Sequence, residues 1–272
     1  WKFQSNVKER KTILNKISVI AHTSFLGHTG YANHSRAFFT HLNKYFPTRV
    51  RNFTYESDLS YVTPEQKKMI IEQKWDNPPY TVGVPFIKDP GTTYVNLVLN
   101  ESHHYYFYHK YDGPLIFYNV WEATKQMPEF FARMLQADEF WCPTLWQRQM
   151  TIEQGYPENK IKVVPEGVDG KRFYPLPGNE RKTERSKLCR KYNIPSDAFI
   201  YTVFGRWDYR KSIEEIIRTF LNKFRGDAKT YIVLSVDNPF SVDGMNSTEE
   251  RLKHHGLEHE NIKVLHFPSD AE

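Results

Sequence analysis

Short apolar runs alternate with amphipathic stretches along the first part of the chain. Branched and aromatic residues dominate these runs, which is typical of buried strands. Strands are predicted at 16–21, 94–99, 115–120 and 161–164. One face of a predicted helix collects Phe38, Phe39, Leu42, Tyr45 and Phe46, and 130–135 predicts another helix. Strands that alternate with helices indicate a parallel, doubly wound sheet.

The same pattern restarts after the segment Pro175-Leu176-Pro177-Gly178. A charged helix through Tyr192 comes first, and strands follow at 199–204, 231–236 and 262–267. The helix from Ser212 has an apolar stripe of Ile213, Ile216, Ile217, Phe220, Leu221 and Phe224. We therefore predict an α/β protein with two Rossmann-like doubly wound domains, 1–172 and 173–272. The second is incomplete, because three strands leave an open sheet edge.

Composition narrows the class of protein. The 272 residues, 39% of them hydrophobic, can bury a large core, and the net charge of +5 suits anionic ligands or a peripheral membrane contact rather than nucleic acid. Cys142 and Cys189 have no disulfide or zinc-site spacing, which favours a reducing compartment, the cytoplasm or the cytoplasmic face of a membrane. No run is long enough to span a bilayer. The start at Trp1 rather than Met predicts an excerpt of a longer protein.

The strand at 199–204 leads directly into Gly205 and Arg206, and Lys211 follows at the start of the next helix. Two cations therefore lie where backbone N–H groups converge, which predicts an anion site for a diphosphate. The alternative is an ordinary solvated Arg/Lys pair. Ser212 and Glu215 have the spacing of a capping box at this helix start.

Thr144 and Gln147 have the same spacing and predict a second capping box, which opens a helix that runs through about Gln154. Gly155 and the residues after it end this helix.

Four motifs in order carry a family resemblance. They are Tyr118-Asn119-Val120-Trp121-Glu122, Ala137-Asp138-Glu139-Phe140-Trp141-Cys142-Pro143-Thr144, Val164-Pro165-Glu166-Gly167-Val168-Asp169 with Phe173 and Pro175, and Gly205-Arg206 with Lys211. Together they resemble the family 4 retaining glycosyltransferases of the GT-B fold. The resemblance implies two domains that face a cleft and transfer of a sugar, with retention, from a nucleotide-diphosphate sugar. The acceptor would be a hydroxyl of a glycan, a lipid-linked or a protein-linked molecule.

The resemblance also implies roles for residues of the second domain, which would hold the donor. Arg206 and Lys211 would bind the diphosphate and stabilise it as it leaves, because bond breaking builds negative charge there. Gly205 and Ser212 flank them, and Ser212 stands where the family usually has glycine. No metal or other cofactor is implied.

In the first domain, Gly27 and Gly30 resemble the glycine loop that approaches donor or acceptor in this family. Their spacing is not G-x-G-x-x-G, which argues against NAD binding, and a plain turn is the alternative. Glu122 would orient hydroxyls or stabilise developing positive charge, unless it caps the next helix. Asn119 is a weaker neighbouring candidate.

His103 and His104 lie in an aromatic-rich segment and are candidates for the acceptor site, although such aromatics usually serve packing. A metal site is not predicted there, since no acidic or cysteine partner has ligand spacing.

Two questions stay open: which group acts as general base, and which of the rival functions applies. No general base is identified, and the departing phosphate can take the proton. Glu250 and Glu258 have the spacing of the family's donor-binding acidic pair but come too early in the chain, so we reject them as that motif. The rival functions are a nucleotide-sugar epimerase or hydrolase on the same fold, and a non-catalytic nucleotide-sugar-binding module.

Overall fold

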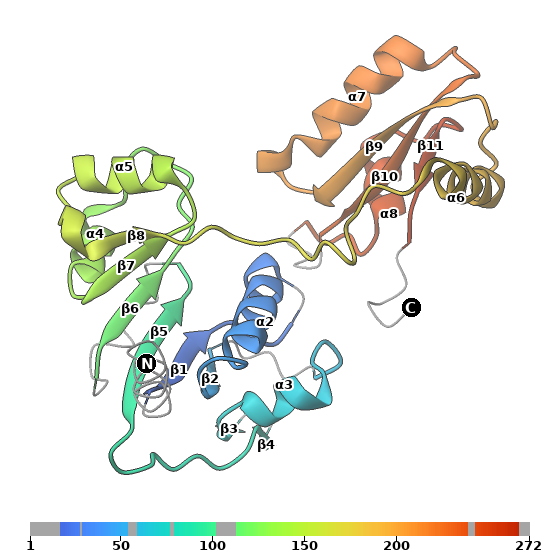
Figure 1. Cartoon of the computed structure of the whole chain (residues 1–272). Coiled ribbons are helices and arrows are strands. Elements are labelled where there is room, and N and C mark those ends of the chain that lie inside the picture. The colour runs from blue at the N-terminus through green and yellow to red at the C-terminus, as the bar shows by residue number, and fades with distance from the viewer. Residues whose placement is uncertain are drawn as a thin grey trace, which may run out of the picture. The chain divides into compact units, whose positions relative to one another are not determined.

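The chain folds as two compact units, Trp1–Val168 and Asp169–Glu272. The computed structural model describes residues 17–27, 29–53, 59–76, 79–101, 113–238 and 243–266. Each unit is built on its own parallel sheet (Figure 1). The α/β architecture predicted from the sequence is thus confirmed. The predicted roles of 1–172 as the acceptor-side domain and 173–272 as the donor domain stay a prediction.

Unit 1 contains a six-stranded parallel sheet. Its strands, in spatial order, are β2 (Thr48–Asn52), β1 (Ile17–Thr23), β5 (Thr93–Leu99), β6 (Leu115–Tyr118), β7 (Glu139–Cys142) and β8 (Ile161–Val163). The helices between them are α2 (Gly30–Leu42), α3 (Pro64–Met69), α4 (Pro128–Met134) and α5 (Leu145–Glu153), with the short 3-10 helix η2 (Glu158–Lys160) before β8. A separate antiparallel ribbon pairs β3 (Gln73–Asp76) with β4 (Pro79–Val82).

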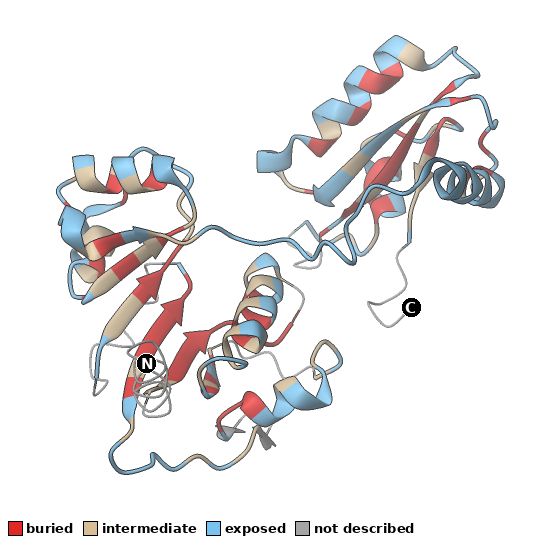
Figure 2. Cartoon of the chain, in the orientation of Figure 1, coloured by how far each residue is buried: buried red, intermediate tan, exposed pale blue. Residues whose placement is uncertain are grey.

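Both faces of this sheet are buried, because successive residues of a strand point to opposite sides. Leu97 and Leu99 of β5 belong to a core that includes Phe39 of α2, whereas Val98 between them packs with Phe117 and residues of α4. Figure 2 shows the central strands as the most buried part of unit 1. A sheet with both faces covered is the doubly wound arrangement.

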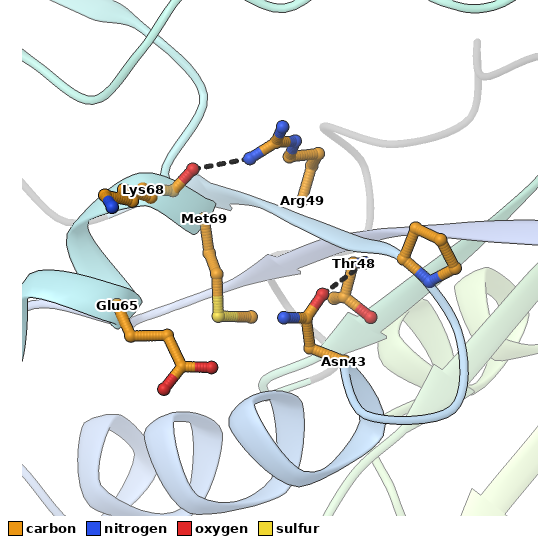
Figure 3. A pocket seen from close by; sticks show the side chains of 7 residues that line it. Asn43, Thr48, Arg49, Glu65, Lys68 and Met69 are labelled. Carbon is orange, nitrogen blue, oxygen red and sulfur yellow. Dashed lines mark hydrogen bonds between the residues drawn. The ribbon is translucent and has the colours of Figure 1, made fainter.

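A hollow of about 300 Å³ lies at the amino end of this sheet, between the end of α2, the start of β2 and α3 (Figure 3). Two hydrogen bonds of the fold border it: Arg49 donates to the carbonyl oxygen of Lys68 at 2.5 Å, and the Thr48 backbone N–H donates to Oδ1 of Asn43 at 2.9 Å. No residue of the predicted site lines this hollow.

Unit 2 contains a three-stranded parallel sheet in the order β11 (Ile262–Val264), β10 (Thr230–Asp237), β9 (Phe199–Arg206). The helices are α6 (Gly178–Lys191), α7 (Ile213–Phe224) and α8 (Thr248–His254), and the 3-10 helix η3 (Tyr209–Lys211) joins β9 to α7. Within the described residues β9 pairs with β10 alone, as the sequence predicted for an incomplete sheet.

The predicted apolar stripe of α7 is largely confirmed. Ile213, Ile217, Phe220 and Leu221 are buried against the sheet, while Ile216 is 39% exposed. Ile216 instead lines a hollow of about 580 Å³ with Tyr201 of β9 and their neighbours. Among the described residues, no helix has both the length and the hydrophobicity needed to cross a bilayer.

Candidate functional site

The turn from β9 to α7 is organised by Asp208. Its Oδ2 accepts a hydrogen bond from Nε of Arg206 at 2.6 Å, and its Oδ1 accepts one from the backbone N–H of Lys211 at 2.9 Å. Burial acts to raise the pKa of Asp208, but these bonds and the nearby arginine charge lower it below its ordinary value. One carboxylate therefore fixes the guanidinium and the backbone of the second cation, a role that the sequence analysis missed.

Gly205 precedes Arg206 with a φ of 142°, a backbone conformation that favours glycine. The side chains of Arg206 and Lys211 are exposed at the carboxyl end of β9. This is the edge at which open α/β sheets bind ligands. The four residues predicted as the donor site of the second domain, Gly205, Arg206, Lys211 and Ser212, thus lie in one short turn.

Ser212 has left-handed backbone angles, φ 49° and ψ 37°, at the junction of η3 and α7. The predicted capping box with Glu215 is wrong, because the Ser212 side chain makes no capping hydrogen bond. A capping serine takes extended angles, and the left-handed geometry prevents that. A left-handed position favours glycine, so the serine is held there at a cost in backbone energy.

In unit 1, Gly27 and Gly30 follow the carboxyl end of β1, and Asn119 and Glu122 follow the carboxyl end of β6. Gly27, at φ 84°, ends the turn after β1, and its carbonyl accepts a hydrogen bond from Arg36 at 2.7 Å. Gly30 opens α2, and Thr29 caps that helix by accepting from the N–H of Ala32. The turn is therefore well anchored, which fits both a ligand loop and a plain turn. His103 and His104 lie outside the described residues.

Asn119 follows β6 and is 1% exposed. The Trp121 backbone N–H donates to Oε1 of Gln147 at 3.1 Å, so Nε2 of Gln147 is the donor to the backbone oxygen and Oδ1 of Asn119, at 3.0 and 3.1 Å. This fixes the orientation of the Asn119 amide, whose Nδ2 has no hydrogen-bond partner among the described residues. The buried Nδ2 of Asn119 therefore keeps two N–H groups that no described residue satisfies.

Gln147 was predicted only as half of a capping box. Thr144 does cap α5 by accepting from the backbone N–H of Gln147, but the Gln147 side chain turns to Asn119 and Trp121 instead of back to the helix start. Glu122 is exposed and does not cap the next helix, since α4 begins after Met127 with no side-chain cap.

The start of α2 contributes two ring side chains to the same edge. Nδ1 of His34 lies 2.9 Å from Oε1 of Glu166, just after β8. Burial raises the pKa of Tyr31, and the charges of Glu101, Glu166 and Glu122 raise it further. Glu122 thus lies within electrostatic reach of the helix that Gly30 begins. No group of metal-ligating side chains occurs in the part of the chain that the structure describes.

Comparison with solved structures identifies proteins of similar architecture. The chain is similar to HepE from Anabaena, solved in complex with UDP, with a TM-score of 0.64 and 14% identity over 94% of this chain and 70% of that one. A glycosyltransferase from Rickettsia africae gives a TM-score of 0.60 and 15% identity, covering 94% and 69%. An E. coli protein described as trehalose-6-phosphate, bound with UDP-2-fluoro glucose, gives 0.55 and 10%, covering 93% and 74%.

At these identities the likeness establishes the fold, which is that of the GT-B glycosyltransferases, as the sequence motifs predicted. No protein-family model and no curated protein matches the sequence.

Proposed function

We propose that this protein is a glycosyltransferase that moves a sugar, with retention, from a nucleotide-diphosphate sugar to a hydroxyl acceptor. The observation that carries the proposal is the Asp208-organised turn, which presents Arg206 and Lys211 at the carboxyl end of a parallel strand in a GT-B fold. Solved structures of this fold contain UDP and UDP-glucose, which supports a nucleotide sugar as the donor.

In this proposal, unit 2 holds the donor. Arg206 and Lys211 neutralise the diphosphate as the anomeric C–O bond breaks, and Gly205 and Ser212 shape the turn that brings backbone N–H groups toward it. Rigid placement matters because cations fixed before the reaction lower the barrier without further reorganisation. No metal is required by this mechanism, and the place of action is the cytoplasm or the cytoplasmic face of a membrane.

Unit 1 serves the acceptor and the sugar. The Asn119 amide donates to a hydroxyl oxygen, and Glu122 accepts from a hydroxyl or stabilises positive charge at the anomeric carbon. Gly27 and Gly30 bring the backbone of the first turn close to the ligand, and His103 and His104 contribute to the acceptor site.

Mass spectrometry after incubation with UDP-glucose and a panel of glycan, lipid-linked and peptide acceptors tests the proposal. A new glycoside together with UDP supports transfer, and an α-anomeric product from the α-linked donor supports retention. Free glucose and UDP without a glycoside would indicate the rival hydrolase, and an isomerised UDP-sugar the rival epimerase. Nucleotide binding without any product would indicate the non-catalytic module.

Two variants link the result to the site. Arg206→Ala should lower kcat by about 10²–10³-fold, the usual effect of losing one group that stabilises transition-state charge. Lys223→Ala removes an exposed cation of α7 that lines the apolar hollow, and it should leave kcat unchanged.

A further inference from the structure

His34 and Glu166 form a pair at the carboxyl edge of the sheet in unit 1. His34 lies on the second turn of α2, and its Nδ1 is 2.9 Å from Oε1 of Glu166. The His34 ring meets Phe38 and Tyr118 edge-on, with centroids 5.9 and 5.3 Å away. Packing on two sides and the carboxylate on a third therefore hold the imidazole in one orientation.

The position of the carboxylate determines which ring nitrogen bears the proton. A lone pair on Nδ1 would repel a carboxylate oxygen at 2.9 Å, so Nδ1 carries the hydrogen and Nε2 keeps the lone pair. Nε2 makes no hydrogen bond to the described residues, and the side chain is 17% exposed. The ring therefore keeps a proton acceptor without a partner among the described residues, on a side chain that is partly open to solvent.

Two opposing effects act on the pKa of this ring. Burial lowers the pKa of His34 below its ordinary value, and the charge of Glu166 opposes that shift. The Tyr118 hydroxyl donates to the carbonyl of Val164 at 2.7 Å and so fixes the chain two residues before Glu166. Tyr31 on α2, in the field of Glu101, Glu122 and Glu166, and Tyr118, whose pKa is raised by burial and by the charge of Glu166, are further titratable groups near this pair.

We propose that His34, oriented by Glu166, is the general base that takes the proton of the acceptor hydroxyl. The inference deepens the proposed function and rests on it. The hydroxyl proton moves to Nε2, the hydroxyl oxygen bonds to the anomeric carbon, and the bond from that carbon to the diphosphate oxygen breaks. The electron pair leaves with the nucleoside diphosphate. Glu166 stabilises the imidazolium, which then returns its proton to water.

The pH dependence of turnover with UDP-glucose and the best acceptor of the panel tests this role. Loss of a general base should lower kcat in His34→Gln by about 10²-fold or more and remove the acid limb of the pH profile, with the Kd for UDP unchanged. Glu166→Gln should shift that limb to lower pH, because the carboxylate raises the pKa of His34. His41→Gln changes an exposed histidine of the same helix and should match the parent protein.

An unchanged acid limb in His34→Gln, or a raised KM with unchanged kcat, would overturn the inference and leave the proposed function intact. A parent chain that neither binds UDP nor turns over UDP-glucose contradicts the proposed function itself. Nitrogen-15 NMR of the parent protein provides a test that needs no substrate. Protonation at Nδ1 is expected, and a proton on Nε2 instead would overturn the assignment of His34 as the base.

Discussion

Replacing Gln147 by leucine tests whether one side chain holds the segment that carries Asn119. Gln147 is 2% exposed, and its amide makes three hydrogen bonds, one from the Trp121 backbone and two to Asn119. Each such bond contributes about 1 kcal/mol net, so Gln147→Leu should lower the free energy of unfolding by about 3 kcal/mol. Leucine has a similar volume, so an empty cavity does not explain the loss.

Urea unfolding followed by circular dichroism measures this effect. Gln149→Leu is the matched control, because Gln149 lies on the same helix, is exposed, and its side chain donates to Oε1 of Glu153, at 2.8 Å. The control should change the free energy of unfolding by no more than about 0.5 kcal/mol. Gln147→Glu should also destabilise the protein, since it removes the donor that faces two oxygens of Asn119.

The reasoning fails if Gln147→Leu is no less stable than Gln149→Leu. In that case the amide of Gln147 would not hold the 119–121 segment, and the orientation of Asn119 derived from it would lose its basis.

Three further predictions concern stability, each checked by urea unfolding. Ser212→Gly should raise the free energy of unfolding by about 0.5–1 kcal/mol, because glycine adopts the left-handed backbone angles of this position without strain. A lower free energy of unfolding in this variant would contradict the left-handed geometry. Burial lowers the pKa of His22 to about 3, so the unfolded chain takes up a proton first as the pH falls below about 6.5. Stability should therefore fall between pH 6.5 and 3, by at most about 1.4 kcal/mol per unit, and His22→Gln should flatten this slope; equal slopes would refute the assignment. Arg251→Met should lower the free energy of unfolding by about 3 kcal/mol, because the fully buried guanidinium bonds Asp243 and Asp237; an unchanged midpoint would contradict this.

Most of the strands could be predicted because their hydrophobic runs are strong local signals. The predicted run at 94–99 covers all of β5 except its first residue, and the run at 231–236 lies within β10. The strands β2 and β7 were missed, since Thr48–Asn52 carries two arginines and Glu139–Cys142 is only four residues long. Pairing with neighbouring strands, with β1 for β2 and with β6 and β8 for β7, makes these segments strands rather than local preference.

The details of the site depended on tertiary structure. The turn from Gly205 to Lys211 is contiguous in sequence, and its position at a strand end was therefore predictable. Gln147 pairs with Asn119 and Trp121 from a different helix and loop, and no local pattern indicates that contact. The close approach of His34 and Glu166 likewise arises only when the parallel strands bring α2 and the end of β8 to one edge.

At Ser212 a local sequence pattern predicted a helix cap that the structure does not form. The Ser-x-x-Glu spacing is a valid local signal for a cap, but the tight passage from η3 to α7 imposes a backbone that the cap cannot adopt.

Calorimetric titration with UDP tests the central claim most directly. The parent chain should bind UDP, Arg206→Ala should weaken the affinity by about tenfold to a hundredfold, the effect of losing a charge-assisted contact, and Lys223→Ala should bind like the parent. Equal affinity of the parent and Arg206→Ala would contradict the assigned diphosphate site. An absence of UDP binding under conditions in which the parent chain is folded, together with no binding of other nucleoside diphosphates, would contradict a nucleotide-sugar transferase altogether.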